Sequence, residues 1–248
     1  MTMKCNKILG ILLILIFLIV FFSCSYFFLK DFFELKENNE DTEKLIDDAI
    51  EIITDIEDKN IKASINWDYL KSINENIIGW IEIEDTNINY PILKDNDNLY
   101  YLKHSYNKKY NSNGSIFTLD DKPFEIEETL IYGHNMRNNK SMFSQLGNYL
   151  DKDFLYSHRN IKIYTQSQNY IGEIFSCYSI GMETENANIK SLDFNEKIKY
   201  YKSSSKYKMN STDNINKIIK LSTCSYINAR THPTNQRYYI IANIIPIE

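Results

Sequence analysis

Glycine and proline are scarce in this sequence: its 248 residues include seven glycines and four prolines. Long flexible linkers are therefore not expected, and one folded domain behind an N-terminal segment is the natural organisation. Basic charge is not in excess either, because the formal net charge is −5, and this argues against a nucleic-acid-binding surface. Tyrosine and phenylalanine are plentiful, with 19 and 13 residues, and both favour a β-rich core.

Cysteines are also few, and they divide between two regions. Cys5 and Cys24 lie in or beside an apolar N-terminal stretch, which leaves Cys177 and Cys224 for the folded domain. One disulfide between these two is an open alternative to two free thiols, but the chain has too few cysteines for a dense disulfide framework. Neither a CxxC pair nor an HExxH motif occurs, so we expect no metal site and no cofactor.

The N-terminal stretch is long enough to cross a membrane. Lys4 and Lys7 precede an apolar run from Ile8 to Leu29, and a helix of that length spans a hydrocarbon core of about 30 Å. A cleavable signal peptide would have a shorter apolar core and a small-x-small cleavage site. We predict an uncleaved signal-anchor with the N-terminus inside and the following domain outside, because basic residues precede the span and acidic residues follow it. A lipoprotein attached through Cys24 is the weaker alternative.

Two helices are predicted between this anchor and the main domain. Apolar residues recur at helical spacing from Leu45 to Ile56, which predicts an amphipathic helix over Lys36–Asn60. Its polar face is acidic, as suits a spacer standing off a membrane. A second, shorter helix is expected over Trp67–Asn76. The sequence therefore predicts an anchor (1–30), a helical spacer (31–66) and a β-barrel domain (67–248).

From Gly79 onward the apolar pattern changes to period-two alternation, as in Trp80–Glu84. About eight short strands follow with few helices between them, which predicts a mainly β fold and a closed or nearly closed barrel. The acid pairs Asp120-Asp121 and Glu127-Glu128 are expected in solvated turns. The predicted strands are Trp80–Glu84, Ile88–Leu93, Gly114–Leu119, Thr129–Tyr132, Ile161–Thr165, Tyr170–Ile180, Ile218–Cys224 and Tyr238–Ile245, with helices over Ser141–Leu150 and Phe194–Tyr207 and a helical turn over Asn96–His104.

Three side chains suited to acyl transfer fall at the ends of these predicted strands. Cys224 ends one strand, Arg237 precedes the last strand, and His134 follows the strand Thr129–Tyr132. A lone cysteine is more often a buried structural residue. The combination favours chemistry, because a thiolate is a nucleophile that nearby cations favour, a histidine can protonate a leaving amine, and an arginine can donate to an oxyanion.

The residues around these three positions resemble the motifs of sortases. LSTC at 221–224 is similar to the catalytic-cysteine motif TLxTC, although Lys220 stands where threonine is usual. YGHNM at 132–136 resembles the histidine motif, and Arg237 before YYIIANI resembles the arginine that opens the final strand. The N-terminal helices and the helix before the cysteine strand resemble class B sortases. The resemblance implies an eight-stranded sortase-type β-barrel with N-terminal helices.

The resemblance also implies the reaction. Cys224 would attack the threonine carbonyl of a C-terminal sorting motif of the NPxTx or xPxTG kind, carried by a surface protein. His134 would protonate the departing amine, and Arg237 would hold the developing oxyanion. An amine of peptidoglycan or of its precursor would then resolve the thioester. The substrate-binding residues expected on this basis are Asn98, Leu102, Ile189, Ser222 and Thr223.

Other readings stay open at this point. Arg230 competes with Arg237 for the arginine role, although its place inside a polar loop favours Arg237. A thiol peptidase without transfer activity would need the same cysteine and histidine, and a sortase of another class is a further alternative. A binding module that has lost catalysis is disfavoured, because all three functional residues are intact.

Overall fold

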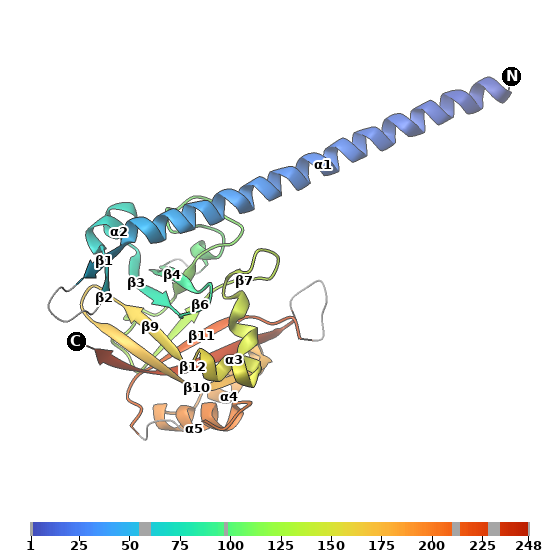
Figure 1. The fold of residues 1–248 in the computed structure, drawn as a ribbon. Coiled ribbons are helices and arrows are strands. Elements are labelled where there is room, and N and C mark those ends of the chain that lie inside the picture. Colours follow the sequence, from blue (N-terminus) through green and yellow to red (C-terminus); the bar gives the residue numbers. More distant parts are fainter. Residues whose placement is uncertain (1, 55–60, 97–98, 210–213, 228–233, 248) are drawn as a thin grey trace. The chain divides into compact units, whose positions relative to one another are not determined.

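The computed structural model describes residues 2–54, 61–96, 99–209, 214–227 and 234–247 (Figure 1). Contacts between residues divide the chain into two units, Met1–Leu45 and Ile46–Glu248. The first unit consists of most of helix α1 (Thr2–Ala49). The second unit contains the barrel that the sequence predicts.

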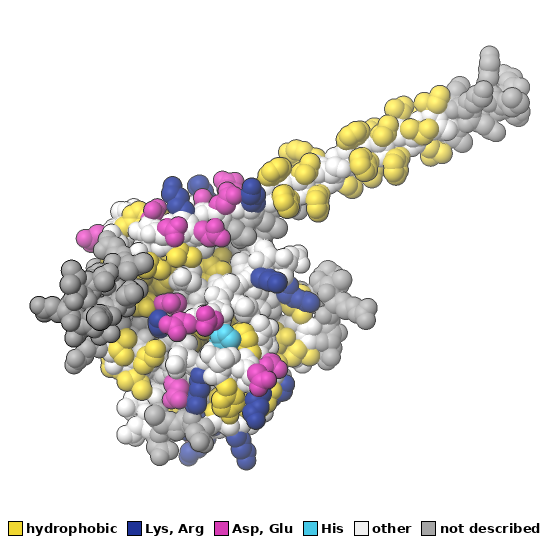
Figure 2. Space-filling model, viewed as in Figure 1, with side chains coloured by type: hydrophobic (Ala, Val, Ile, Leu, Met, Phe, Trp, Pro, Cys, Tyr) yellow, Lys and Arg dark blue, Asp and Glu magenta, His cyan; other side chains and the backbone are white. Residues whose placement is uncertain are grey.

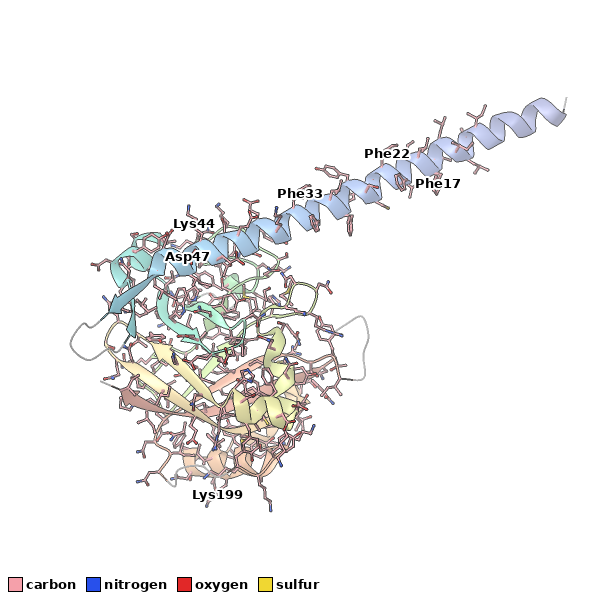
Figure 3. All side chains as sticks on the ribbon, viewed as in Figure 1. Phe17, Phe22, Phe33, Lys44, Asp47 and Lys199 are labelled. Carbon is pink, nitrogen blue, oxygen red and sulfur yellow. The ribbon has the colours of Figure 1, made fainter. Side chains whose placement is uncertain are left out.

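Helix α1 carries an apolar segment, Gly10–Lys30, that is long and apolar enough to cross a membrane. Phe17, Phe22 and Phe33 point away from the helix axis and are exposed (Figure 3). Toward the other end of the helix, charged side chains such as Lys44 and Asp47 replace the apolar ones (Figures 2 and 3). Exposed apolar area on this scale is unfavourable in water, so the segment has the composition and the length of a membrane span.

The helix expected over Lys36–Asn60 ends early, at Ala49, and in this respect the prediction is wrong. A two-stranded antiparallel sheet follows, formed by β1 (Ile50–Thr54) and β2 (Ile61–Ile65). The β-branched residues of IEIIT lose χ1 freedom in a helix and favour a strand. Residues 55–60 of the expected helix lie outside the described part of the chain. The second predicted helix is present as α2 (Trp67–Ile73), which begins where the Asn66 side chain accepts from the Tyr69 N–H.

Eight strands close the barrel, in the order β10-β12-β11-β6-β5-β4-β3-β9, which confirms the predicted fold. Neighbouring strands are antiparallel except for two pairs, β4 with β5 and β6 with β11. The parallel pairing of β6 with β11 places the ends of both strands at the same rim. The barrel strands are β3 (Ile77–Glu82), β4 (Asn89–Lys94), β5 (Ile116–Thr118), β6 (Glu128–Tyr132), β9 (Asn160–Tyr164), β10 (Asn169–Gly181), β11 (Ile218–Cys224) and β12 (Gln236–Ile247).

Short helices and one small hairpin connect the strands. The helix predicted to start at Ser141 is displaced, because Ser141–Met142 forms strand β8 against β7 (Asn135–Met136). A 3₁₀ helix, η2 (Ser144–Leu150), follows instead, and the sequence did not predict α3 (Lys152–Ser157) or α4 (Met182–Ile189). The helix expected over Phe194–Tyr207 is present as α5 (Phe194–Ser204), and the helical turn is η1 (Tyr100–Leu102).

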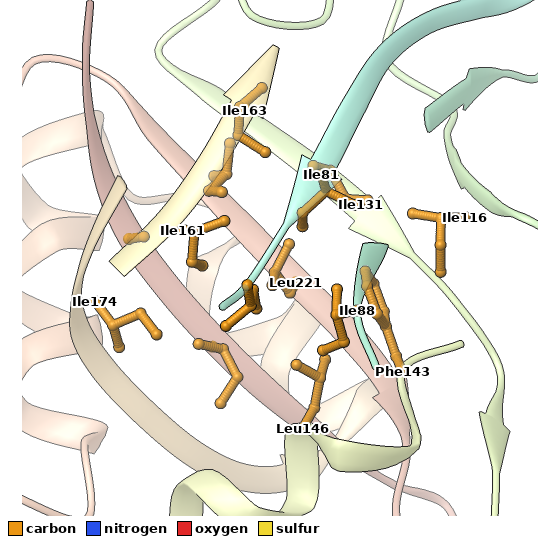
Figure 4. Close-up of a cluster of buried hydrophobic side chains, with 14 of the residues drawn as sticks. Ile81, Ile88, Ile116, Ile131, Phe143, Leu146, Ile161, Ile163, Ile174 and Leu221 are labelled. Carbon is orange, nitrogen blue, oxygen red and sulfur yellow. The ribbon is translucent and has the colours of Figure 1, made fainter. Parts of the chain in front are cut away.

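Apolar side chains fill the barrel and also a second layer outside it. The interior cluster includes Ile81, Ile131, Ile161 and Leu221, all fully buried (Figure 4). A second cluster packs α5 on the outer face of β10, β11 and β12, where Lys199 points out from the far side of the helix (Figures 1 and 3). Strand β11 is thus buried on both faces, and its last residue is Cys224. The main members of the outer cluster are Phe175, Tyr178, Ile198, Tyr201, Ile218, Tyr239 and Ile241.

Candidate active site

Strand pairing makes Cys224 and Arg237 neighbours. Cys224 is the last residue of β11, and its backbone partner in the antiparallel strand β12 is Arg237. Directly paired residues on adjacent strands have their Cβ atoms about 4.5–5.5 Å apart and on the same face of the sheet. The thiol and the guanidinium therefore share one face at the rim of the barrel, as the sequence predicts.

Strand β6 brings His134 to the same rim. Ser222 pairs with Tyr132 in the parallel ladder, and the ladder continues because the Gly133 N–H donates to the Ser222 carbonyl at 3.3 Å. The Thr223 hydroxyl donates to the Gly133 carbonyl at 2.7 Å. His134 thus follows directly on a backbone segment that is bonded to the two residues before Cys224.

The residue after His134 bonds to the cysteine itself. The Asn135 side-chain amide donates to the Cys224 carbonyl at 2.8 Å, and Asn135 is buried. One hydrogen bond therefore fixes the spacing between the histidine segment and the cysteine. The sequence alone does not reveal this contact, although the asparagine directly follows the histidine in YGHN.

The His134 ring is oriented by a backbone carbonyl. Its Nε2 lies 2.8 Å from the carbonyl oxygen of Leu102 in η1. Because a carbonyl only accepts, this contact places a proton on Nε2 and leaves Nδ1 to take or release the second proton. The His134 carbonyl in turn accepts from the Phe143 N–H at 2.9 Å. The ring is half-buried, which keeps it within reach of a substrate.

The Arg237 guanidinium is held by its own strand entry. Its Nη1 donates to the carbonyls of Thr234 and Gln236, at 3.4 and 3.2 Å. The side chain is half-buried, and the fork retains other N–H groups that can donate to a substrate. The competing Arg230 lies outside the described residues, so the choice between the two arginines stays a prediction.

The two cysteines of the second unit differ sharply in environment. Cys177 is fully buried in β10, and burial raises the pKa of its thiol to about 11. Cys224 is partly exposed. Both thiols are free, so the disulfide alternative is not realised. Because the thiolate is the nucleophilic form, Cys224 is the better placed of these two for attack.

The substrate-binding residues expected from the sequence are placed differently. Leu102 lies at the site through its carbonyl contact with His134. Ser222 and Thr223 are buried, with 4% and 2% of their surface exposed. Ile189 ends α4 and helps to line a pocket of about 620 Å³ together with Glu128 and Phe194. This pocket lies near the first residues of β6 and β11, whereas Cys224 is the last residue of β11. Asn98 lies outside the described residues. Direct substrate contact stays a prediction for all five.

Two of the acidic residues expected in solvated turns are half-buried instead. Asp120 accepts from the Leu130 N–H at 2.7 Å, and desolvation raises the pKa of its carboxyl group. Glu128 pairs with Lys197 at 2.8 Å and accepts from the Tyr201 hydroxyl. Within the described ranges, no group of three or more His, Cys, Asp or Glu side chains could hold a metal ion.

A partly exposed thiol, a histidine and an arginine lie at one rim of a closed eight-stranded barrel, and these are the side chains that a cysteine acyl transferase needs. The sequence family described as the sortase domain matches residues 81–245 of this chain. The sortase B of Listeria monocytogenes serovar 1/2a is 35% identical over 233 residues, which cover 90% of this chain and 92% of that protein.

Two solved structures extend the similarity. Sortase B from Clostridium perfringens has a TM-score of 0.63 and 30% identity, and the match covers 73% of this chain and all of that one. Sortase B from Bacillus anthracis has a TM-score of 0.69 and 28% identity, with 86% and 98% of the two chains covered. The chain belongs to the sortase family of cysteine transpeptidases, and its similarity to class B members confirms the resemblance seen in the sequence.

Proposed function

We propose that Cys224, His134 and Arg237 carry out the transpeptidation. The observation that carries this proposal is the register of β6, β11 and β12, which gathers the three residues at one rim. The hydrogen bond from Asn135 to the Cys224 carbonyl supports it, because reacting groups must be held in a defined geometry.

The first half-reaction cleaves the sorting signal. The Cys224 thiolate attacks the threonine carbonyl carbon of the bound peptide, and the oxyanion that forms accepts from the Arg237 guanidinium. The C–N bond then breaks as His134 gives a proton to the departing amine, which leaves a thioester on Cys224.

The second half-reaction joins a new amine. His134, now neutral, takes a proton from the incoming amine as its nitrogen attacks the thioester carbonyl. A new amide forms, the thiolate of Cys224 leaves, and the starting protonation states are restored.

Sortases join surface proteins that carry C-terminal sorting signals to amines of the cell wall. The sorting motif and the acceptor amine of this chain are proposed below. We infer a sorting pentapeptide of the NPxTx or xPxTG kind and an acceptor amine on peptidoglycan or its precursor. Leu102, Ile189, Ser222, Thr223 and Asn98 are proposed to contact or shape the bound peptide. No cofactor and no metal are proposed.

The N-terminal helix is consistent with a membrane anchor, since its apolar segment is long enough to span. We propose a single-pass protein with the N-terminus inside and the catalytic domain outside. Residues 1–30 would form the stub and anchor, 31–66 the helical spacer with its small β-hairpin, and 67–248 the catalytic barrel. Such an arrangement would hold the enzyme where both substrates are found.

Product analysis tests transfer against simple cleavage. The full-length protein in detergent is given a library of sorting peptides, with and without a peptidoglycan-type amine such as a short oligoglycine or a diaminopimelate peptide. We expect cleavage after threonine and an amide-linked product whenever a suitable amine is present. Hydrolysis alone with every amine would instead identify a thiol peptidase.

A further inference from the structure

A lysine is fully buried on the catalytic strand. Lys220 lies four residues before Cys224 in β11, with 2% of its surface exposed. Side chains two residues apart share a face of a strand, so Lys220, Ser222 and Cys224 face the outside of the barrel, while Ile219 and Leu221 fill its interior. The position is also where this chain departs from the TLxTC motif.

The partner of this lysine is a buried carboxylate on α4. The Lys220 ammonium forms an ion pair with Glu185, whose side chain is 1% exposed. Two tyrosines also bond the carboxylate, because the hydroxyls of Tyr178 and Tyr200 donate to it at 2.6 and 2.8 Å. Burial without such partners would be strongly unfavourable for either charge.

Aromatic rings enclose the charged pair. The Lys220 ammonium lies 4.6 Å from the ring centre of Tyr201 in α5 and 4.5 Å from that of Tyr239 in β12. The Tyr201 hydroxyl donates to Glu128 of β6, which pairs with Lys197. The network therefore connects α4 and α5 to four strands of the barrel, β6, β10, β11 and β12, and β11 ends at Cys224.

Apart from Glu185, the side chains of α4 make few contacts: Asn188 donates to the Tyr200 hydroxyl at 3.1 Å, and Ile189 packs against the outer cluster. Glu185 is its one fully buried side chain, and most of its other side chains are exposed. An amphipathic helix is ordinarily fastened by an apolar stripe, but METENANI offers Ile189 alone near its end, with Met182 exposed at its start. The ion pair takes the place of that stripe.

The start of α4 lies beside the proposed site. It follows Gly181, which pairs with Gln236 in the barrel ladder, and the Met182 N–H donates to the Asn235 carbonyl at 3.2 Å. Asn235 is two residues before Arg237. A shift of α4 would therefore be felt next to the guanidinium.

We propose that Lys220 and Glu185 are positioning residues that fix α4 as a wall of the peptide groove beside Arg237 and Cys224. The inference rests on the proposed function for its substrate. The pair acts on binding of the sorting peptide rather than on bond breaking, since neither side chain reaches the reacting atoms. Lys220 stands where the motif has threonine, and Glu185 neutralises its buried charge.

Removal of one charge or of both separates positioning from plain stability. Losing one partner leaves a buried, unpaired charge, whereas replacing both with apolar groups of similar volume is often neutral for stability. The test compares Lys220→Met with Lys220→Met/Glu185→Leu in the full-length protein. Lys197→Met is the matched control, because it removes an ion pair of the same network that does not involve α4.

Three measurements are made on each variant: the thermal midpoint Tm, peptide-cleavage kinetics and hydrogen exchange of residues 182–189. We expect the double variant to regain most of the Tm lost by Lys220→Met, yet to keep a KM raised by about tenfold with kcat within about twofold. Its α4 amides should exchange faster, while those of α5 stay as protected as in the unmodified protein. Lys197→Met should change neither KM nor exchange in α4.

A double variant with restored Tm, unchanged KM and unchanged exchange in α4 would overturn the inference and leave the proposed function standing. If the unmodified protein cleaves no sorting peptide, the proposed function fails, and exchange in α4 still decides whether the pair holds the helix. If the double variant does not fold, Glu185→Gln is measured in its place. It keeps the shape of the side chain and removes the charge, so faster exchange in α4 is again expected, and unchanged exchange refutes the role.

Discussion

Two of the three proposed catalytic side chains are held through backbone carbonyls. The Arg237 guanidinium donates to the carbonyls of Thr234 and Gln236, and His134 Nε2 lies against that of Leu102. Carbonyls accept without changing charge, so these contacts orient the two groups and leave their charges for the substrate. A preorganised donor is the kind that contributes most to a transition state.

Replacement of the two arginines tests that role. Arg237→Ala should lower kcat/KM by about 10²–10³, the usual loss for an oxyanion donor, whereas Arg230→Ala should have a small effect. Arg237→Lys should also be poor, because an ammonium does not reproduce the planar fork of donors. Steady-state kinetics on the three variants measures this. A crippled Arg230→Ala beside an active Arg237→Ala would show that the loop, and not the start of β12, supplies the arginine.

Gly133 is needed for a steric reason. A Cβ on this residue would lie 2.4 Å from Ile116 Cδ1 and 2.7 Å from Phe143 Cδ2. Gly133→Ala should therefore lower the free energy of unfolding by about 1–3 kcal/mol, as overpacking does, and should also displace His134. Gly181→Ala is the control, because its Cβ would meet nothing closer than 3.5 Å. Equal denaturation midpoints for the two variants would refute the steric account.

At the scale of elements, the β pattern was easier to predict than the helices. Period-two alternation located β3 and β4, and the β-branched runs located β11 and β12, because barrel strands bury one face in a regular way. The helix predicted over Lys36–Asn60 is present as far as Ala49, where α1 ends, and its last part is not helical. A helical periodicity continues past Ala49 in the sequence, while the local β preference of Ile50–Thr54 prevails in the fold.

Helix α4 could not be predicted because its sequence has no helical periodicity of apolar residues. Its one fully buried side chain is Glu185, and the partner of that carboxylate, Lys220, lies 35 residues away in the chain. In the proposed site, too, some features could be predicted from the sequence and others could not. Side-chain chemistry and strand ends pointed to Cys224, His134 and Arg237, whereas contacts such as that of Asn135 with Cys224 depend on the three-dimensional pairing of β6 with β11.

The start of α5 offers a test at this scale. Asp193 and Glu196 form a reciprocal capping box, in which each side chain accepts from the backbone N–H of the other residue. Asp193→Ala should cost about 1 kcal/mol, which in a domain of this size lowers Tm by about 2–4 °C. Asn195→Ala, an exposed change in the same turn, is the control and should stay within about 0.5 kcal/mol. Matching thermal midpoints for the two variants would mean that the cap is not needed.

For the whole molecule, the two units imply separable roles. The apolar part of α1 should hold the protein in the membrane, and the second unit contains a complete barrel. We expect the full-length protein to resist extraction by high salt and alkaline carbonate, and a variant lacking residues 1–30 to be soluble and to cleave sorting peptides. Salt-extractable full-length protein would contradict the anchor.

The orientation is tested separately on intact cells. A protease added to cells stripped of their wall should digest the catalytic domain if it lies outside, as the basic residues before the span predict. Protection of the domain under conditions that digest a known surface protein would contradict the proposed topology.

The central claim is that the acyl group of a sorting peptide is carried on Cys224. Mass spectrometry of the full-length protein, quenched in acid after incubation with peptide and no amine, tests this directly. We predict one thioester adduct on the fragment that contains Cys224. The adduct should be discharged on addition of an amine and should be absent from Cys224→Ala. It should be retained in Cys177→Ala, because the Cys177 thiol of the unmodified protein is buried and burial raises its pKa to about 11. An adduct on Cys177, or turnover by Cys224→Ala, would contradict the account.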